Sequence, residues 1–417
     1  MQIDFLDPNT YDADMWERFS WCRENDPLYW DEGNELFVAT THRDVSAISK
    51  NSRLFCSEPG TRPGMPVKLS ILDMDEPRHG QLRGLINKGF TPRMVAKLED
   101  YFRKLTTAAI DRVAPKGECD FVQDIAVPLP LELIAELIGI DKSDRARFHR
   151  WSDDMMNAEG QWMNQEAMAT AGAAFNEYIG YLEDIFESRH KEPKDDLVSI
   201  LVGAKQEGLL GYNREEFAED VVERLGSEEA AQDAADELRM FMVALLVAGN
   251  ETTRNAISGG ISALIENPGQ RQKLMDNPAM TQLAADEIVR YVSPVLSFAR
   301  TATADTELRG KTIEKGRKVL MIYPSANRDA AVFENPDAFI VDRDPNPHLG
   351  FGIGNHFCLG ANLARMEVRV VLDEVLRRMA DMEYTNRGPE MHPHTLVRSF
   401  VHMPVRFTPE DVGHRAA

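Results

Sequence analysis

The stretch FGIGNHFCLG, residues 351–360, places one cysteine, Cys358, among residues that otherwise offer little chemistry. The nineteen letters that follow, ANLARMEVRVVLDEVLRRM, have the apolar spacing of a helix. Cys358 is therefore expected on a loop just before a helix N-terminus, where free N–H groups and the helix dipole favour a thiolate. The glycines of the loop, Gly352, Gly354 and Gly360, let the backbone pass close to a flat group. An ordinary loop cysteine would not require them.

The composition favours a large globular protein and excludes some partners. The chain has 417 residues, 43% of them hydrophobic, with 47 Lys and Arg against 68 Asp and Glu and a net charge of −21. A chain of this size can bury an extensive core. Because phosphate binding needs clustered Lys and Arg, the acidic balance argues against nucleic acid or an anionic membrane surface as the main partner.

Neither a leader nor a membrane span is predicted. The first residues, MQIDFLDPNTYDADMW, are acidic where a signal peptide is basic and then apolar. The longest apolar run, residues 240–249, is about half of the roughly 20 residues that cross a bilayer. We therefore expect a cytoplasmic protein. Its four cysteines are widely spaced without a C-x-x-C pair, which indicates neither a zinc site nor a disulfide framework.

Apolar periodicity predicts a mostly helical chain. The stretch LYWDEGNELFVAT, residues 28–40, instead reads as a β-hairpin around a D-E-G-N turn. With no internal repeat and no low-complexity linker, we expect one domain, residues 1–417. The acidic segment 211–236 is expected to be a solvated helical insertion. The predicted helices span residues 94–113, 131–138, 167–189, 195–205, 237–264, 277–292 and 362–379.

The loop resembles the signature F-x-x-G-x-[RH]-x-C-x-G of the cytochrome P-450 haem-thiolate proteins. Its five specified positions are matched by Phe351, Gly354, His356, Cys358 and Gly360. The resemblance runs along the whole chain and implies a mainly α fold, the cytochrome P-450 fold, with a small β-rich region. It also implies that haem b is the cofactor and Cys358 the axial ligand of its iron. The residues it places at the haem within this loop are Phe351, Gly352, His356 and Gly360.

The segment AGNETT, residues 248–253, resembles the oxygen-activating segment of the same family. Consecutive polar residues after an apolar run bring a carboxylate and hydroxyls into an apolar interior; taken alone, the segment could also be a capped helix end. By the resemblance, Ala248 and Gly249 border the haem and O2, Thr252 binds the oxygen, and Glu251 relays protons as a catalytic acid.

Basic side chains elsewhere match the positions that bind haem propionates in the family. His79 and Arg83 form an H-x-x-x-R pair on one face of a predicted helix, and Arg300 follows a second predicted helix. His356 stands where many members carry arginine. Each of these groups, taken singly, could be exposed surface charge.

The pair Glu287 and Arg290 falls where the family has a structural E-x-x-R, and Arg343 is expected to complete that buried network. We assign this network to the scaffold and not to catalysis. The histidines of MHPH, residues 391–394, read as part of a loop, because a proline separates them and no third metal ligand lies near.

The substrate is predicted to be large and hydrophobic. The stretches FCSEPGTRP (55–63) and CDFVQDIAVPLP (119–130) are most similar to the branch that hydroxylates steroid and sterol side chains. Terpenoids and fatty acids remain alternatives, as does a haem-thiolate sensor without turnover, although such a sensor has no need of Glu251 and Thr252. The expected pocket walls, any of which could equally be core, are Met65, Val67, Leu69, Val243, Ala244, Val247, Val295, Leu296, Phe298, Phe400 and Val401.

As a monooxygenase of this type, the protein is expected to receive electrons from a small acidic ferredoxin and its ferredoxin reductase. The cations expected to meet the ferredoxin on the cysteine side of the haem are Arg78, Lys88, Arg93 and Lys97.

Overall fold

The computed structural model describes residues 1–12, 14–64, 68–87, 92–158, 164–211, 236–385 and 388–410. Four of the sequence predictions fall outside these ranges, wholly or in part. They concern Met65, Val67, Lys88 and nearly all of the acidic segment 211–236; the side chain of Arg93 is likewise not described.

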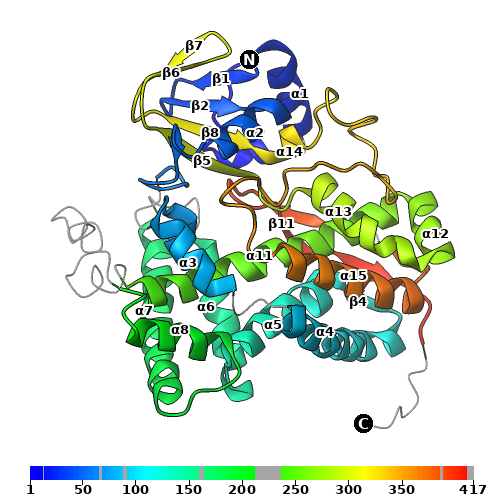
Figure 1. Ribbon diagram of the computed structural model, residues 1–417. Coiled ribbons are helices and arrows are strands. Elements are labelled where there is room, and N and C mark those ends of the chain that lie inside the picture. The colour runs from blue at the N-terminus through cyan, green and yellow to red at the C-terminus, as the bar shows by residue number, and fades with distance from the viewer. Residues whose placement is uncertain are drawn as a thin grey trace.

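Helices form most of the described chain; the sheet that contains β1, β2, β5 and β8 lies at one end, and β4 and β11 lie among the helices (Figure 1). The mainly α fold expected from the sequence is confirmed. The helices in the first half are α1 (Met15–Asn25), α2 (His42–Lys50), α3 (Arg78–Ile86), α4 (Pro92–Val113), α5 (Pro128–Ile138), α6 (Arg145–Asn157), α7 (Gln165–Lys191) and α8 (Leu197–Gln206). Those in the second half are α11 (Glu237–Glu266), α12 (Pro268–Asp276), α13 (Thr281–Val292), α14 (Tyr323–Ala326) and α15 (Ala361–Arg378).

The largest described sheet joins strands from residues 28–56 with strands from residues 297–322, in the order β1-β2-β8-β5-β3. The predicted hairpin is present, with Leu28 opposite Ala39 in β1 and β2. The strands of this sheet are β1 (Leu28–Asp31), β2 (Leu36–Ala39), β3 (Phe55–Cys56), β5 (Ser297–Ala302) and β8 (Lys318–Ile322). Smaller sheets contain β4 (Glu118–Asp120), β9 (Glu383–Tyr384) and β12 (Pro404–Arg406); β6 (Thr306–Leu308) and β7 (Lys311–Ile313); and β10 (Glu390–His392) and β11 (Ser399–His402).

The helical core is built around α11, which runs through the middle of the molecule (Figure 1). Most of its residues are buried all round, as expected of a helix with little amphipathic character. A Cβ on Gly260 would stand 2.7 Å from Ile288 Cδ1, and one on Gly259 would stand 2.6 Å from Val292 Cγ1. These two glycines therefore let α13 pack directly against α11.

Six of the seven predicted helices agree with observed helices to within about three residues. The remaining prediction, 277–292, covers a 3-10 turn at Pro278–Met280 followed by α13. The sequence analysis did not predict α1, α2, α12 or α6, and α6 is the longest of them. This helix is rich in charged residues, and its buried face consists mainly of Phe148, Trp151, Ser152 and Met156. A sequence with so few apolar positions is also typical of a surface loop. Only the packing of α6 against α7 explains why it forms a helix.

Candidate active site

The backbone of the cysteine loop is shaped by two glycines with positive φ. Gly352 has a φ of +67° and Gly354 a φ of +81°, a region that side chains with a Cβ rarely adopt. A Cβ on Gly354 would also lie 2.8 Å from the main-chain oxygen of Ser49. The turn is closed by the N–H of Cys358, which donates to the Phe351 carbonyl at 2.8 Å. Cys358 thus sits immediately before α15, as the sequence predicts.

Cys358 is partly buried, and desolvation of its thiol raises the pKa. The backbone N–H of Gly360 and the guanidinium groups of Arg83 and Arg365 act in the opposite direction. The raised pKa favours the protonated form of the thiol, whereas the sequence analysis expected surroundings that favour a thiolate. Binding of a metal releases the proton, which is the behaviour required of a thiolate ligand.

Four basic side chains predicted to bind haem propionates lie together beside this loop. The ring of His356 stacks near that of His79, with centroids 4.2 Å apart, and its Nε2 lies 2.9 Å from the Ser57 hydroxyl. Burial, with the positive charges of Arg300, His79 and Arg83, lowers the pKa of His356 to about 3. Arg83 donates to the main-chain carbonyl of Phe357 at 2.7 Å. These groups come from α3, β5 and the cysteine loop.

Among the described residues, one carboxylate lies within 4.0 Å of these four bases: Glu76 Oε1 is 3.4 Å from His79 Nδ1. Within the described residues, neither Arg83 nor Arg300 has a carboxylate within 4.0 Å, and the buried Nε2 of His79 has no hydrogen-bond partner. A buried cation without a counter-charge is unfavourable, so the cluster is suited to an anionic group. The two carboxylates of a haem fit this requirement, and Cys358 offers the metal ligand on the adjoining loop.

Midway along α11, one face becomes accessible. Ala248 is exposed and Thr252, one turn later, is half-buried, although most residues of the helix are buried. The Thr252 hydroxyl donates to the Ala248 carbonyl at 2.8 Å. Gly249 does not line this face: a Cβ there would come within 2.7 Å of Ile134 Cδ1, so this glycine is explained by the packing of α5 against α11.

Glu251 points away from solvent into a charged contact. Its Oε2 lies 2.8 Å from Arg254 Nη2, and its buried Oε1 has no hydrogen-bond partner among the described residues. Burial raises the pKa of Glu251 to about 7, although Arg254 opposes the rise. Arg254 also lies 3.6 Å from the half-exposed Asp153 on α6. Glu251 is thus poised to exchange a proton near neutral pH.

Three of the predicted pocket walls, Val247, Val295 and Phe298, lie in one cluster. We call this group, together with Met156, Leu396 and Val397, the distal apolar cluster. A backbone bridge between Val295 and Val397 fixes two of its segments to each other. Met156, Leu396 and Val397 were not predicted. The apolar pair Leu396 and Val397 in the sequence HTLVRSF, residues 394–400, could have indicated this part of the wall. The prediction instead chose Phe400 and the next residue, Val401.

The other described wall candidates lie elsewhere. Phe400 belongs to the main helical core, where its ring contacts the backbone position of Gly259, and the Val401 carbonyl accepts a hydrogen bond from Gln123. Leu296 points to the opposite side of the chain from Val295, into the core between the main sheet and α1, because side chains alternate along an extended strand. Leu69, Val243 and Ala244 are buried in the main core.

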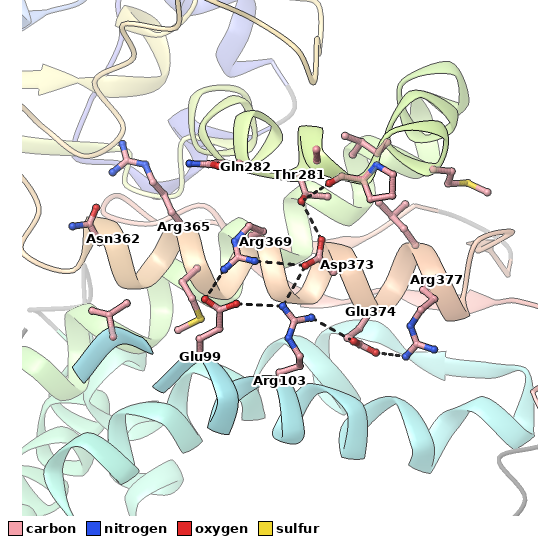
Figure 2. A pocket seen from close by; sticks show the side chains of 17 residues that line it. Glu99, Arg103, Thr281, Gln282, Asn362, Arg365, Arg369, Asp373, Glu374 and Arg377 are labelled. Carbon is pink, nitrogen blue, oxygen red and sulfur yellow. Dashed lines mark hydrogen bonds and ion pairs between the residues drawn. The ribbon is translucent and has the colours of Figure 1, made fainter. Parts of the chain in front are cut away.

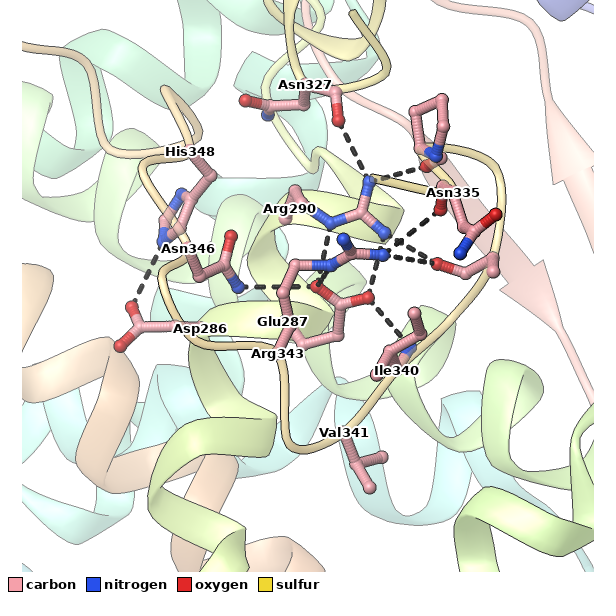
Figure 3. A network of polar contacts seen from close by, with 12 residues as sticks. Asp286, Glu287, Arg290, Asn327, Asn335, Ile340, Val341, Arg343, Asn346 and His348 are labelled. Carbon is pink, nitrogen blue, oxygen red and sulfur yellow. Dashed lines mark hydrogen bonds and ion pairs between the residues drawn. The ribbon is translucent and has the colours of Figure 1, made fainter. Parts of the chain in front are cut away.

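The predicted E-x-x-R pair is buried completely at Glu287 and Arg290 (Figure 3). All five N–H donors of Arg290 are used: two hydrogen bonds reach the Glu287 carboxylate, and three reach the carbonyls of Asn327, Pro336 and Ala338. As expected, Arg343 joins the network, 3.1 Å from Glu287. The network holds the loop that leads to Cys358, since the Asn327 side chain accepts from Leu349 N–H.

Replacing Arg290 with leucine is expected to lower the free energy of unfolding by about 3–5 kcal/mol, because the buried Glu287 would lose its two-bond partner and three buried carbonyls would lose their donor. Urea unfolding followed by circular dichroism measures this loss. The matched control is Arg406→Leu, which removes an exposed ion pair with Glu383 and should cost at most about 1 kcal/mol. Equal losses in the two variants would contradict a structural role for the network.

A groove of about 1130 Å³ lies between α4, α15 and the segment joining α12 to α13 (Figure 2). Several of its charges pair with one another: Arg103 pairs with Glu99 and Asp373, and Arg369 pairs with the same two acids. The groove adjoins the first turn of α15, just after the cysteine loop, and its lining holds four arginines against three acids.

Two of the cations expected to meet a ferredoxin are occupied within the chain. Arg78 forms an ion pair with Glu237 at the start of α11, and Lys97 lies 2.8 Å from Asp195. Arg78 therefore connects α3 to α11. Its ion pair with the buried Glu237 leaves it poorly placed to attract a partner.

Comparison with known proteins identifies the family. The cytochrome P450 family matches residues 60–408. Steroid C26-monooxygenase of Mycobacterium tuberculosis is 36% identical over 410 residues, which cover 98% of this chain and 97% of that protein. The corresponding enzyme of Mycolicibacterium smegmatis is also 36% identical, over 94% of this chain and 92% of its own length.

Solved structures agree with this relationship. CYP109E1 from Bacillus megaterium, in complex with testosterone, has a TM-score of 0.80 and 29% identity, covering 94% of this chain and 99% of that chain. CalO2 has a TM-score of 0.83 and 26% identity, covering 98% and 99%. The chain belongs to the cytochrome P450 family.

It follows that the protein is a haem-thiolate monooxygenase with haem b as cofactor. Such an enzyme inserts one atom of O2 into a C–H bond of a hydrophobic substrate and takes electrons from redox partners. Among the helices that the structure describes, none is both long and apolar enough to cross a membrane.

Proposed function

We propose that this monooxygenase hydroxylates a steroid or sterol. The observation that carries the proposal is its similarity, along almost the entire chain, to relatives that bear the name steroid C26-monooxygenase. The distal apolar cluster supports it, because a rigid hydrocarbon skeleton is held chiefly by the apolar area that it buries.

We assign the haem to the residues around the cysteine loop. Cys358 is the axial ligand, and His79, Arg83, Arg300 and His356 receive the propionates. When bound, the haem iron supplies the activation of O2, favoured by electron donation from the thiolate. The assignment rests on the presence of only one carboxylate within 4.0 Å of these four bases, among the described residues, and on the position of the thiol beside them.

Glu251 and Thr252 are assigned to proton delivery. Glu251 holds a proton near neutral pH because its carboxyl is buried. The Thr252 hydroxyl lies on the accessible face of α11 and donates to the Ala248 carbonyl. In the proposed role it exchanges this hydrogen bond for one to a group in the interior. Val247, on the neighbouring face, helps to exclude water from the reacting carbon.

The electron donor is proposed to be an acidic ferredoxin served by a ferredoxin reductase. Arg78 and Lys97 are paired internally, and Arg365 near the cysteine loop pairs with Asp286, so we assign the contact to no single one of these cations. We further propose that residues 1–417 form one domain in the cytoplasm. The main sheet supports a single domain, because it combines strands from residues 28–56 with strands from residues 297–322.

A spectral titration of the ferric protein tests the substrate class. A steroid ketone should displace the water from the iron at low micromolar concentration, and should bind more tightly than a monoterpene or a C12 fatty acid. The physical reason is buried area: at about 25 cal/mol per Å² a steroid gains several kcal/mol over a small terpene, without the ordering entropy of a flexible chain. Tighter binding of either competitor would overturn the steroid assignment and leave the monooxygenase class intact.

A further inference from the structure

His394 lies in the connection between β10 and β11, next to the distal apolar cluster. Its Nδ1 accepts hydrogen bonds from the main-chain N–H groups of Leu396 and Val397, at 3.0 and 3.3 Å. Both of these residues belong to the cluster. The connection itself is held in place by the Leu396 carbonyl, which accepts from Leu296 N–H at 2.8 Å. The imidazole is therefore fixed on the wall of the cluster.

The hydrogen bonds at Nδ1 determine the tautomer of the ring. A nitrogen that accepts two N–H groups cannot carry a proton, so a neutral His394 bears its hydrogen on Nε2. Burial, with the positive charges of His392, Arg62 and Arg254 nearby, lowers the pKa of His394 to about 4. At neutral pH the ring is uncharged and presents one N–H donor.

That donor is not satisfied within the described part of the chain. Nε2 is buried and has no hydrogen-bond partner of adequate geometry, although the main-chain carbonyl of Met156 is a neighbour. Met156 is itself a member of the distal apolar cluster. A polar donor is thus held between three apolar residues, two of which fix its orientation.

We propose that the Nε2–H of His394 donates a hydrogen bond to a neutral oxygen acceptor, a carbonyl or hydroxyl, on the substrate. The inference deepens the proposed function and rests on it, since it takes the distal apolar cluster as the substrate wall. An uncharged imidazole suits a ketone or alcohol better than a carboxylate, which prefers a charged donor. His394 then orients an otherwise featureless hydrocarbon, because a site with a buried donor discriminates against an analogue without the acceptor.

Ligands that differ only in their carbonyl group separate the effect of this hydrogen bond from that of the apolar contacts. The ferric holoenzyme is titrated with 5α-androstan-3-one, 5α-androstan-17-one and 5α-androstane, which share one skeleton and differ only in the carbonyl. For the wild type, at least one ketone is expected to bind about tenfold more tightly than the hydrocarbon, the usual scale for a satisfied against an unsatisfied buried donor. In His394→Phe this ratio should fall to about one, and in His394→Gln, whose amide can donate, it should recover in part.

His392 provides the matched control, since it is exposed on the same hairpin two residues earlier. His392→Phe should keep the wild-type ratio. If His394→Phe keeps it too, or weakens all three ligands equally, His394 only secures the hairpin to α6 and the proposal is overturned. If the wild type binds none of the androstanes, the steroid assignment fails; camphor and bornane, again one skeleton with and without a carbonyl, then give the same ratio and decide the role of His394.

Discussion

Replacement of Cys358 by alanine is expected to abolish monooxygenase activity and to remove the red-shifted absorbance of the reduced carbon monoxide complex. That absorbance requires a thiolate on the iron, and the Cys358 thiol is the one that adjoins the cluster of His79, Arg83, Arg300 and His356. Haem content should fall as well, because the propionate contacts alone would have to retain the cofactor. Absorbance spectra of the reduced protein with and without carbon monoxide measure both effects.

Cys56 offers a matched control for this substitution. It is the cysteine of β3, and its thiol donates to the Glu58 carbonyl at 2.6 Å. Cys56→Ala should keep the red-shifted band and the activity. A Cys358→Ala protein that retained the band would exclude Cys358 as the ligand, whatever its activity.

Glu251→Gln is expected to slow substrate oxidation by roughly 10²–10⁴-fold, the usual contribution of a positioned general acid. In the wild-type protein the pKa of Glu251 is raised to about 7, so the carboxyl is protonated below that pH and ionised above it. Product formation should therefore decline as the pH rises through about 7. Glutamine keeps the shape of the side chain but has no proton to deliver, so the variant should be slow and nearly independent of pH.

The measurement is the rate of product formation between pH 6 and pH 9, together with the fraction of reductant that ends in product. Glu266→Gln, at the far end of the same helix, is the control and should keep the wild-type profile; its carboxylate contacts the Tyr384 hydroxyl at 3.0 Å. A Glu251→Gln variant with a wild-type rate, or with an unchanged decline near pH 7, would remove Glu251 from the proton path.

The cysteine loop and the helix after it could be predicted because their signals are local. Gly352 and Gly354 are required by the backbone of the loop itself, and the apolar spacing of α15 is visible in one segment. The E-x-x-R network was predictable in part: the spacing of Glu287 and Arg290 indicated the ion pair, but the carbonyls of Asn327, Pro336 and Ala338 that surround it come from a loop without a sequence pattern.

The substrate wall was harder to predict because it depends on which side of a segment faces inward. Val295 and Leu296 are neighbours in sequence, yet one joins the distal apolar cluster and the other the core beside α1. Ion pairs between residues far apart in the chain likewise leave no pattern in the sequence. Arg78 and Glu237 are 159 residues apart, and only the packed structure brings them together.

The saturated guanidinium of Arg290 bears on how the holoprotein is assembled. Its three carbonyl contacts and the bond from Leu349 to Asn327 involve protein groups alone, so the path of the chain toward Cys358 is set without the cofactor. The entropy of ordering this loop is incurred when the chain folds and not when haem arrives. Haem then binds to a loop that is already ordered. The rate of haem binding is therefore set by how fast haem enters the interior and not by the folding of the loop.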